Sequence, residues 1–543
     1  MRVTTAAEAA LRDADAIAAG VDGYALMHAA GAAAADFIIE KFADTLQNGV
    51  IVYAGAGNNG GDAYIVAALL QGAGITVALT EIGAPGTNSA KRAAALFYTA
   101  TENSSDAVVI RLHYSQKQPR PQHRCVIVDG ILGTGQHGEL RDAERQGALA
   151  INRARSQNGA IVVALDLPTG VNATTGEIAT DAVRADCTLS FGTMKRAHVL
   201  RRDYVGHVVV LDIGLGHHAD KDDGAWLLAD PQLLSPLLPA IAWDSHKGRR
   251  GRVAIVGGAE GMAGAIVLAS RAALRSGAGL VYAHVAKHSV LPLQIAVPQV
   301  VAREWTELPV DIHAAAIGPG FGRSEYSRRR LDDVLRATAG VPTVLDADAL
   351  TLLATTGAAA GATDTELDEA IEPQRPGVTG ISRLRAIAKD RAVVCTPHAG
   401  EFATLIGEAA AGSLHGRVVQ AQHFSANTGV TLLLKGTPTV IVSPERLPAL
   451  VVARGTAVLA TGGSGDLLTG IIGALLAQGA PPRVAAAVGA WIHGRAAEIA
   501  TVQNGSVRGV TLDEVLVAMP AAWSELAGAE PLSGFTLAQL PAL

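Results

Sequence analysis

The feature of this sequence that most constrains its fold is a series of short apolar runs separated by segments long enough for a helix. In the first part of the chain the runs lie at 50–54, 75–79, 125–128, 161–165 and 208–211. Such runs are typical of strands buried on both faces of a sheet, and their alternation with helices is typical of parallel strands. This pattern therefore predicts a layered α/β domain in the first part of the chain.

A second series of apolar runs begins after residue 250, with a run, a glycine loop and a helix at about 262–276. The pattern is lost over 214–251, where prolines, histidines and a basic patch gather. A chain of 543 residues also exceeds the roughly 250 to 300 residues at which a single core divides. We expect two domains, 1–216 and 248–543, joined by a linker at 217–247.

The composition excludes several classes of protein. A formal net charge of −6 argues against a nucleic-acid partner, so the arginine run at 328–330 is interpreted as a solvated helix face. The three cysteines form no CxxC pair, which predicts neither a disulfide framework nor a zinc site and fits a cytoplasmic protein. The longest weakly polar stretch, 467–482, is too short to span a membrane. The segment 357–379 has the composition of a surface insertion.

The first candidate site begins at the loop GAGNNGGD, residues 55–62, which lies between an apolar run and a helical stretch. Its first six residues satisfy GxGxxG, so a Rossmann dehydrogenase with Glu81 as the ribose acid is one interpretation. Two adjacent asparagines at a helix N-terminus indicate something narrower, because their amides can hold an ion or a polar substrate.

Two later runs in the same half end in carboxylates, Asp129 and Asp166. Ligands of open α/β sheets collect beyond the carboxyl ends of strands, so Asn59, Asp129, Asp166 and Thr169 can converge in one crevice. A single aspartate beside a glycine turn more often caps a helix, but three strand ends with polar side chains favour a ligand site.

The second candidate site centres on TGGSGD, residues 461–466, which opens the apolar helix 467–477 and presents backbone amides to an anion. A carboxylate at that point suggests that Asp466 is a base aimed at a substrate hydroxyl; the alternative is a helix cap. Lys435 ends an apolar run and is a natural phosphate contact. His398 follows another run, where it can bind a ligand or cap a helix.

In the first half, the loop at 55–62, DGILGTG at 129–135 and DLPTG at 166–170 resemble the YjeF N-terminal family of NAD(P)HX epimerases over roughly 1–216. Ala63, Thr169 and His28 depart from the family's usual residues, although a threonine keeps the oxygen of the usual serine. The resemblance implies a Rossmann-like three-layer domain, with Asp166 catalytic and Asp129 as an alternative. It implies that Asn59, Asp129 and Thr169 bind potassium. The hydrated nucleotide would contact Asn58, Asn59, Gly60, Gly61, Asp62, Gly133, Thr134, Gly135, Gln136, His137, Gly138, Glu139 and Asp166.

In the second half, GPGFG at 318–322, LDADAL at 345–350, TPHAGE at 396–401, LKGTPT at 434–439 and GGSGD resemble the ribokinase-like YjeF C-terminal family, the ADP- or ATP-dependent NAD(P)HX dehydratases. The resemblance implies catalysis by Asp466, and ADP with Mg²⁺ as the phosphate donor. Its implied adenine-nucleotide contacts are Lys435, Gly436, Thr437, Pro438, Thr439 and Gly465. Its implied NAD(P)HX contacts are Ala265, Gly320, Gly322, His398 and Asp466.

A chain with both halves is expected to be an isomerase and a lyase that repairs hydrated NADH and NADPH, with no nucleic-acid or membrane partner. The first half would interconvert the R and S hydrates, and the second would dehydrate the S form at the expense of ADP, giving AMP and phosphate. Homo-oligomerisation is implied by the family alone. Two other hypotheses remain: a small-molecule kinase of the ribokinase superfamily, and a module that only binds a nucleotide.

Overall fold

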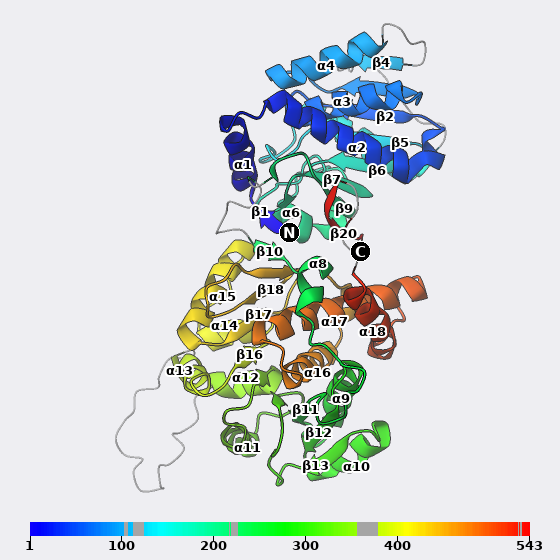
Figure 1. The fold of residues 1–543 in the computed structure, drawn as a ribbon. Helices are drawn as coiled ribbons and strands as arrows, with labels where there is room; N and C mark the ends of the chain where they lie inside the picture. Colours follow the sequence, from blue (N-terminus) through cyan, green and yellow to red (C-terminus); the bar gives the residue numbers. More distant parts are fainter. Residues whose placement is uncertain are drawn as a thin grey trace. The chain divides into compact units, whose positions relative to one another are not determined.

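The computed structural model describes residues 1–101, 107–111, 124–216, 218, 226–355, 378–529, 532 and 535–542. The chain forms two compact units, one of Met1–Trp226 with Pro531–Leu543, the other of Leu227–Glu530 (Figure 1). The expected insertion at 357–379 lies outside the described residues, except that the backbone of helix α13 (Val378–Ile387) begins at its end.

The first unit is built on a sheet that is parallel except for one edge strand. The strand β20 pairs antiparallel with β9 at that edge. All five apolar runs form strands, within two residues of their expected limits. In spatial order the strands are β20 (Thr536–Leu540), β9 (His207–Leu211), β7 (Cys187–Phe191), β6 (Ile161–Leu165), β5 (Val126–Gly130), β2 (Val50–Ala54), β3 (Val77–Glu81) and β4 (Ala107–Arg111).

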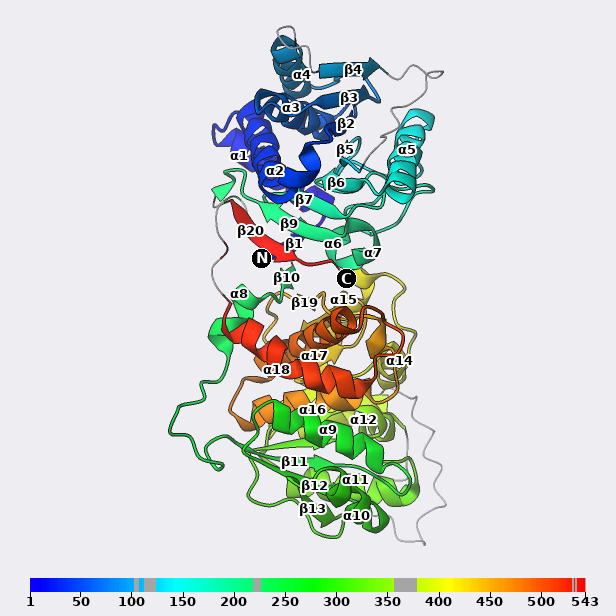
Figure 2. The ribbon, with the colours of Figure 1, turned by 90° about the vertical axis from the view of Figure 1, so that its right-hand side faces the viewer.

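Helices cover both faces of this sheet, as the apolar runs predict. Val50, Val52 and Ala54 of β2 pack with helices α2 (Gly23–Leu46), α3 (Asn58–Gly72) and α4 (Asn88–Thr101). The alternating residues Ile51 and Tyr53 belong to a second core that includes α5 (Asp142–Asn158). Figure 2 shows α5 on the opposite side of the sheet from α2 and α3. The unit is therefore a three-layer α/β domain.

Smaller elements complete the first unit. Helix α1 (Ala6–Ala18) begins with a capping box, in which Glu8 N donates to Thr5 Oγ1 at 3.1 Å and Thr5 N donates to Glu8 Oε2 at 2.6 Å. Strand β1 (Arg2–Thr4) pairs with β8 (Met194–Lys195), and the short helices α6 (Arg196–Leu200) and α7 (Arg202–Val205) follow.

The second unit contains a longer sheet that is parallel from β13 to β17 and continues through a hairpin. Strand β18 is antiparallel to both β17 and β19. In order the strands are β13 (Val301–Glu304), β12 (Leu280–Val285), β11 (Arg252–Val256), β14 (Ala314–Ile317), β15 (Thr343–Leu345), β16 (Val393–Cys395), β17 (Thr431–Leu434), β18 (Thr439–Val442), β19 (Leu450–Val452) and β10 (Trp226–Leu228).

The helices of the second unit include a central one, α16 (Ser464–Ala477), which is apolar on nearly all sides and buried. It shares one core with α9 (Ala263–Arg275), α17 (Pro482–Asn504) and α18 (Leu512–Ala527). Within the described part of the chain, no helix combines the length and apolarity that crossing a membrane requires. The others are α8 (Pro231–Leu234), α10 (Lys287–Ala296), α11 (Glu325–Ala337), α12 (Ala347–Ala354), α14 (Ala399–Ile406) and α15 (Leu414–Thr428), with 3-10 turns η2 (Ser235–Leu237) and η3 (Ala457–Leu459).

The structure differs from the expected domain limits in two places. The segment expected as a linker contains β10, which pairs with β19, and helix α8. The C-terminal strand β20, expected in the second domain, belongs to the sheet of the first unit. A short edge strand carries no local signal of the sheet that it joins, because its partner is distant in sequence.

The arginine run at 328–330 is not the uniformly solvated face that the sequence suggested. Arg328 Nη1 donates to the carbonyl oxygens of Leu352 and Thr355 at 3.2 and 3.1 Å, and Arg330 donates to the carbonyl of Trp305. Arg329 alone of the three is largely exposed. Arg328 and Arg330 therefore lie largely buried against the unit, and their guanidinium groups bind backbone carbonyls.

Candidate functional site

The glycine loop of the first unit is required by close backbone packing. A Cβ added at Gly55 would lie 1.9 Å from the carbonyl oxygen of Ile131, and one at Gly60 would lie 1.9 Å from the carbonyl oxygen of Gly55. A Cβ at Gly61 would lie 2.5 Å from Met27 Sδ. These glycines let the first turn of α3 fold onto the loop and against α2, so that Asn58 and Asn59 stand at the helix N-terminus.

Three of the expected residues meet behind this helix end. Asp129 is fully buried and accepts hydrogen bonds from Thr169 N at 2.8 Å, Thr169 Oγ1 at 2.7 Å and Ile131 N at 3.2 Å. Burial raises the pKa of Asp129 to about 6, although these hydrogen bonds lower it. Both polar atoms of the Asn59 side chain are buried without a hydrogen-bond partner among the described residues. A buried amide in that state is suited to binding an ion or a ligand.

Asp166 stands at the end of β6 in an ion pair that the sequence analysis missed. Lys195 Nζ lies 2.5 Å from Asp166 Oδ1, and both side chains are largely buried. The backbone of Asp166 has a φ of 61°, in the left-handed region that non-glycine residues seldom adopt. Lys195 follows strand β7 by only a few residues, which was the one sequence signal available for it.

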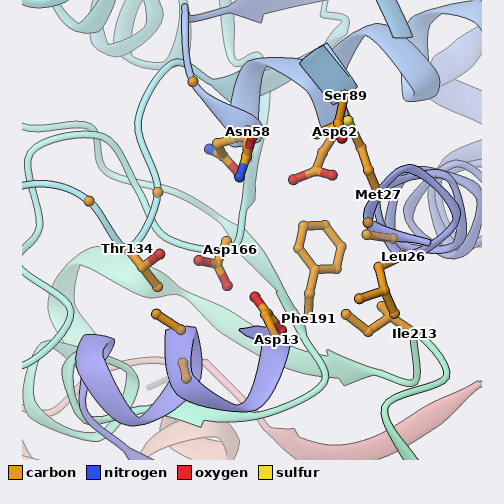
Figure 3. A pocket seen from close by; sticks show the side chains of 18 of the residues that line it. Asp13, Leu26, Met27, Asn58, Asp62, Ser89, Thr134, Asp166, Phe191 and Ile213 are labelled. Atoms are coloured by element: carbon orange, nitrogen blue, oxygen red, sulfur yellow. The ribbon is translucent and has the colours of Figure 1, made fainter. Parts of the chain in front are cut away.

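A cavity of about 610 Å³ lies at the carboxyl ends of β2, β5, β6 and β7. The side chains of Asp13, Asp62 and Asp166 point into it from α1, α3 and the end of β6 (Figure 3). Its walls also carry apolar groups, among them Phe191 and Met27. The cavity therefore combines proton-transferring groups with a surface on which an apolar ring can lie.

Burial raises the pKa of two carboxyl groups in the cavity, beside the ion pair of Asp166 and Lys195. Burial, with the nearby Asp166 and Asp13 adding to it, raises the pKa of Asp62 well above its usual range. Burial also raises the pKa of Asp13, with Lys195 opposing that shift. Among the described residues that line the cavity, Lys195 is the one lysine or arginine. Asp13 lies before the first motif and was not predicted.

The structure brings together some of the predicted nucleotide contacts and separates others. The described residues that line the cavity include Asn58, Asn59, Asp62, Gly133, Thr134, Gly135 and Asp166. They do not include Gly60, Gly61, Gln136, His137, Gly138 or Glu139, nor Asp129 and Thr169. The Gln136 side chain donates to the Gly138 carbonyl at 2.8 Å, and Glu139 accepts from Thr180 N at 2.8 Å.

Glu81, considered as a ribose acid, has other partners. Tyr64 Oη donates to Glu81 Oε1 at 2.6 Å, and Tyr98 Oη donates to the same oxygen. Glu81 is also absent from the described residues that line the cavity. The dehydrogenase interpretation of the glycine loop therefore lacks its ribose contact.

In the second unit, four of the five predicted motifs follow four neighbouring parallel strands, β14 to β17, and GGSGD opens helix α16. The GPGFG turn after β14 requires its glycines: a Cβ at Gly318 would lie 1.9 Å from the Asp346 carbonyl oxygen, and one at Gly320 would lie 3.0 Å from Ala265 Cβ. Gly322 N donates to Asp348 Oδ2 at 2.9 Å. Three of the predicted substrate contacts, Ala265, Gly320 and Gly322, thus lie close together.

A buried aspartate connects the other motifs. Asp346, directly after β15, accepts from Lys435 Nζ at 2.9 Å and from Thr469 Oγ1 at 2.7 Å. Lys435 Nζ also lies 3.8 Å from Glu401 Oε2. A Cβ at Gly465 would lie 3.3 Å from Lys435 Nζ. Lys435 and the first turn of α16 are therefore held side by side, the arrangement expected of a phosphate site. Asp346 belongs to the LDADAL motif, but no role was assigned to it from the sequence.

Asp466 lies half-buried in the first turn of α16. Burial raises its pKa to about 7; the neighbouring Asp346 adds to this rise, and Lys435 opposes it. A carboxyl group with that pKa can accept a proton near neutral pH. Ser464, two residues earlier, has its Oγ 3.2 Å from Nε2 of the buried His493.

The two remaining predicted features are a helix cap and a hairpin turn. His398 is the N-cap of α14, where its Nδ1 accepts from Gly400 N at 2.9 Å and from Glu401 N at 3.2 Å. His398 therefore caps a helix, one of the two roles that the sequence allowed for it. The turn of Lys435, Gly436, Thr437, Pro438 and Thr439 joins the antiparallel strands β17 and β18.

Fold and site together define a class: an α/β enzyme with an acid–base cavity in one unit and a lysine–carboxylate centre at a helix N-terminus in the other. A family model described as YjeF-related protein N-terminus matches residues 23–197, and one described as NAD(P)H-hydrate dehydratase matches 253–365 and 380–520. The chain is 32% identical to the bifunctional NAD(P)H-hydrate repair enzyme Nnr of Pyrobaculum aerophilum, over 93% of this chain and 95% of that one. It is 32% identical to the enzyme of the same name from Escherichia coli, over 90% of this chain and 87% of that one.

The chain therefore belongs to the bifunctional NAD(P)H-hydrate repair enzymes. This confirms the family, the fold class and the bifunctional enzyme predicted from the sequence, and displaces the kinase and binding-module hypotheses. Among solved structures, an ADP/ATP-dependent NAD(P)H-hydrate dehydratase from Bacillus subtilis, co-crystallized with ATP/Mg²⁺, is 26% identical. It covers 55% of this chain and 99% of its own, with a TM-score of 0.46.

Proposed function

We propose that the first unit interconverts the R and S hydrates of NADH and NADPH in its cavity, and that the second unit dehydrates the S form at the expense of ADP, giving AMP and phosphate. The observation that carries the proposal is the cavity at the carboxyl ends of β2, β5 and β6. There the ion-paired Asp166 and the carboxyl groups of Asp62 and Asp13 face one cavity.

Epimerisation follows from reversible opening of the hydrated ring. The hydrated carbon bears a hydroxyl group and is bonded to the ring nitrogen, so removal of the hydroxyl proton and protonation of the nitrogen break the carbon–nitrogen bond and leave an aldehyde. Rotation of the aldehyde and reclosure on its other face give the opposite epimer. Asp166, held by Lys195, is suited to accept the hydroxyl proton. Asp62, whose pKa burial raises well above its usual range, is suited to supply the other proton.

The residues expected to hold potassium fit that ion. Oxygen ligands suit a hard cation, and the buried Asn59 amide has no hydrogen-bond partner in the described part of the chain. Asn59 Cγ would lie 3.2 Å from a Cβ at Gly133, and Thr169 Oγ1 accepts from Leu132 N at 3.1 Å, so both side chains border the same turn after β5. Asn59, Asp129 and Thr169 would hold the ion, and its charge would help to position the hydrated nucleotide.

In the second unit, Asp466 takes the proton of the ring hydroxyl while the terminal phosphoryl group of ADP transfers to that oxygen. Phosphate then leaves as the adjacent carbon loses a proton, which restores the dihydronicotinamide. Lys435 and the amides at the start of α16 would neutralise the phosphates, and Mg²⁺ bound with the nucleotide would supply further positive charge there. The pKa of Asp466, about 7, suits a base at neutral pH.

The proposal is tested by following dihydronicotinamide absorbance from a mixture of R and S NADH hydrates with ADP, ATP or neither, against a protein-free control for spontaneous epimerisation. Complete, fast recovery with ADP is expected. Recovery of only the S fraction would remove the epimerase. No recovery would remove the dehydratase, and separation of the R and S hydrates by chromatography would then measure epimerisation directly. Faster recovery with ATP would change the proposed donor.

We propose further that the protein works in the cytoplasm and as a homo-oligomer. The three cysteines are all buried and unpaired, which fits a reducing compartment. The oligomer rests on the family resemblance, and light scattering on the purified full chain would measure it.

A further inference from the structure

Asp166, Lys195 and His198 form a closed ring of contacts behind the cavity of the first unit. The Lys195 ammonium binds the Asp166 carboxylate, Lys195 N lies 3.0 Å from His198 Nδ1, and His198 Nε2 lies 2.8 Å from the Asp166 carbonyl oxygen. Side chain and backbone of Asp166 are thus both tied to one short segment, 195–198. Neither Lys195 nor His198 belongs to the motifs of this family quoted above.

The protonation state of His198 follows from its partners. The ring is fully buried, and burial together with the Lys195 charge lowers its pKa to about 4, so the imidazole is neutral near neutral pH. Nδ1 can only accept from the Lys195 amide, so the single ring proton lies on Nε2 and is donated to the Asp166 carbonyl. The ring therefore joins the two backbones with one accepted and one donated hydrogen bond.

The Lys195 ammonium group also has all its hydrogen bonds within the protein. Its ammonium donates to Asp166 Oδ1, to Ser190 Oγ at 3.1 Å and to the Phe191 carbonyl at 3.0 Å, which uses all three of its protons. The bonds to Ser190 and Phe191, at the end of β7, fix the position of the ammonium group, and the ammonium group in turn fixes the Asp166 carboxylate. The left-handed backbone of Asp166 is secured by His198 and by the bond from Asp166 N to the Leu189 carbonyl, 2.7 Å long.

We propose that Lys195 and His198 are positioning residues for epimerisation: Lys195 orients the Asp166 carboxylate and compensates its charge, and His198 fixes the backbone turn that aims it into the cavity. This inference rests on the proposed epimerase function. Asp13 from α1 and Asp62 from α3 face the same space, so without Lys195 three carboxyl groups would share it with no lysine or arginine among the described lining residues.

The test compares Lys195→Met, Asp166→Asn and the double variant in the full chain. We expect Lys195→Met to lower the kcat of epimerisation about 100-fold while KM changes less than about threefold. The double variant should be no slower than Asp166→Asn alone, because Lys195 acts through Asp166. Thermal unfolding of the first unit reports whether each variant is folded, and dehydration of the S hydrate by the second unit reports the amount of intact chain. Lys91→Met, on the exposed surface of α4, is the matched control.

His198 is tested by two substitutions that each keep one hydrogen bond. Asn can place an acceptor near the position of Nδ1, and Gln can place a donor near that of Nε2. We expect both to lower kcat about tenfold, again with no further loss in the Asp166→Asn background.

The possible results distinguish a failure of the proposed epimerase function from a failure of the positioning role alone. Wild-type protein without epimerase activity would remove the proposed function itself. An active wild type with an unimpaired Lys195→Met variant would overturn this inference alone. So would losses that multiply in the double variant, or a first unit that melts earlier with a raised KM, since these mark a purely structural role.

Discussion

Single carboxyl groups in this protein acquire different chemistry from their surroundings. Asp346 is buried but bonded to Lys435 and Thr469, so its charge is compensated. Asp466, in the first turn of α16, has a pKa of about 7, because burial and the nearby Asp346 raise it. Asp166 has its own lysine, whereas burial raises the pKa of the nearby Asp62. Neighbouring groups with opposite tendencies are what acid–base chemistry requires.

The first prediction at this scale separates the two active centres. Asp466→Asn should lower dehydration by a factor of about 10² to 10⁴ and leave epimerisation intact, and Asp166→Asn should do the reverse. Each rate is measured on the same preparation, with pure S hydrate for dehydration and R hydrate for epimerisation. Loss of both activities in either variant would contradict two independent centres.

The second prediction concerns pH. If the ionised form of Asp466 is the base, kcat of dehydration should rise as pH increases through about 7, because below that value the carboxyl group is protonated. A profile measured from pH 5.5 to 8.5 with saturating ADP tests this. A flat profile would remove Asp466 as the base.

The third prediction follows from the cause of that pKa. The charge of Asp346 helps to raise the pKa of Asp466, so Asp346→Asn should move the rise in kcat to lower pH. It should also weaken ADP binding, because Lys435 loses the carboxylate that holds it. Thr469→Val is the matched control, since it removes a hydrogen bond to Asp346 and keeps the charge. Its profile should keep the wild-type midpoint.

At the scale of elements, the glycine loop and α3 show how tightly a helix can be set against a strand end. The residues that matter are those whose missing Cβ makes room for backbone, as at Gly55 and Gly60. Gly57 of the same loop has space around it. At Gly57, with a φ of −88°, a Cβ would meet nothing within 4 Å.

The fourth prediction uses this difference. Gly60→Ala should destabilise the first unit by about 1–3 kcal/mol or more, since the new methyl group overlaps the Gly55 carbonyl oxygen. Gly57→Ala should change stability by less than about 1 kcal/mol. Thermal unfolding followed by loss of epimerase activity measures both. Equal effects of the two substitutions would contradict the packing argument.

At the scale of the whole molecule, the chain ends in the unit where it begins. Strand β20 adds an antiparallel edge to the sheet of the first unit after the chain has formed the second. On this strand Leu540 is buried and Leu537 is 40% exposed. The last residues of the chain therefore contribute to the core of the first unit.

The fifth prediction is that Leu540→Ala destabilises the first unit by about 2 kcal/mol or more and lowers its unfolding temperature, with no effect on dehydration. Leu537→Ala, on the same strand, should have little effect on either. Activity of each unit after graded heating provides the measurement. An equal loss of stability in the second unit would contradict the assignment of β20.

The sequence by itself determined the two α/β domains, the glycine loops, the strand-end carboxylates and the family, because a short local segment carries the signal of each. Burial on both faces makes a strand apolar, and a close backbone approach demands glycine. Only the tertiary structure decided that Lys195 and His198 hold Asp166, that Asp13 enters the same cavity, that Asp346 joins Lys435 to α16, and that β20 completes the first sheet. These contacts join residues or elements whose pairing no local pattern encodes, so they exist only once the packed strands and helices bring them together.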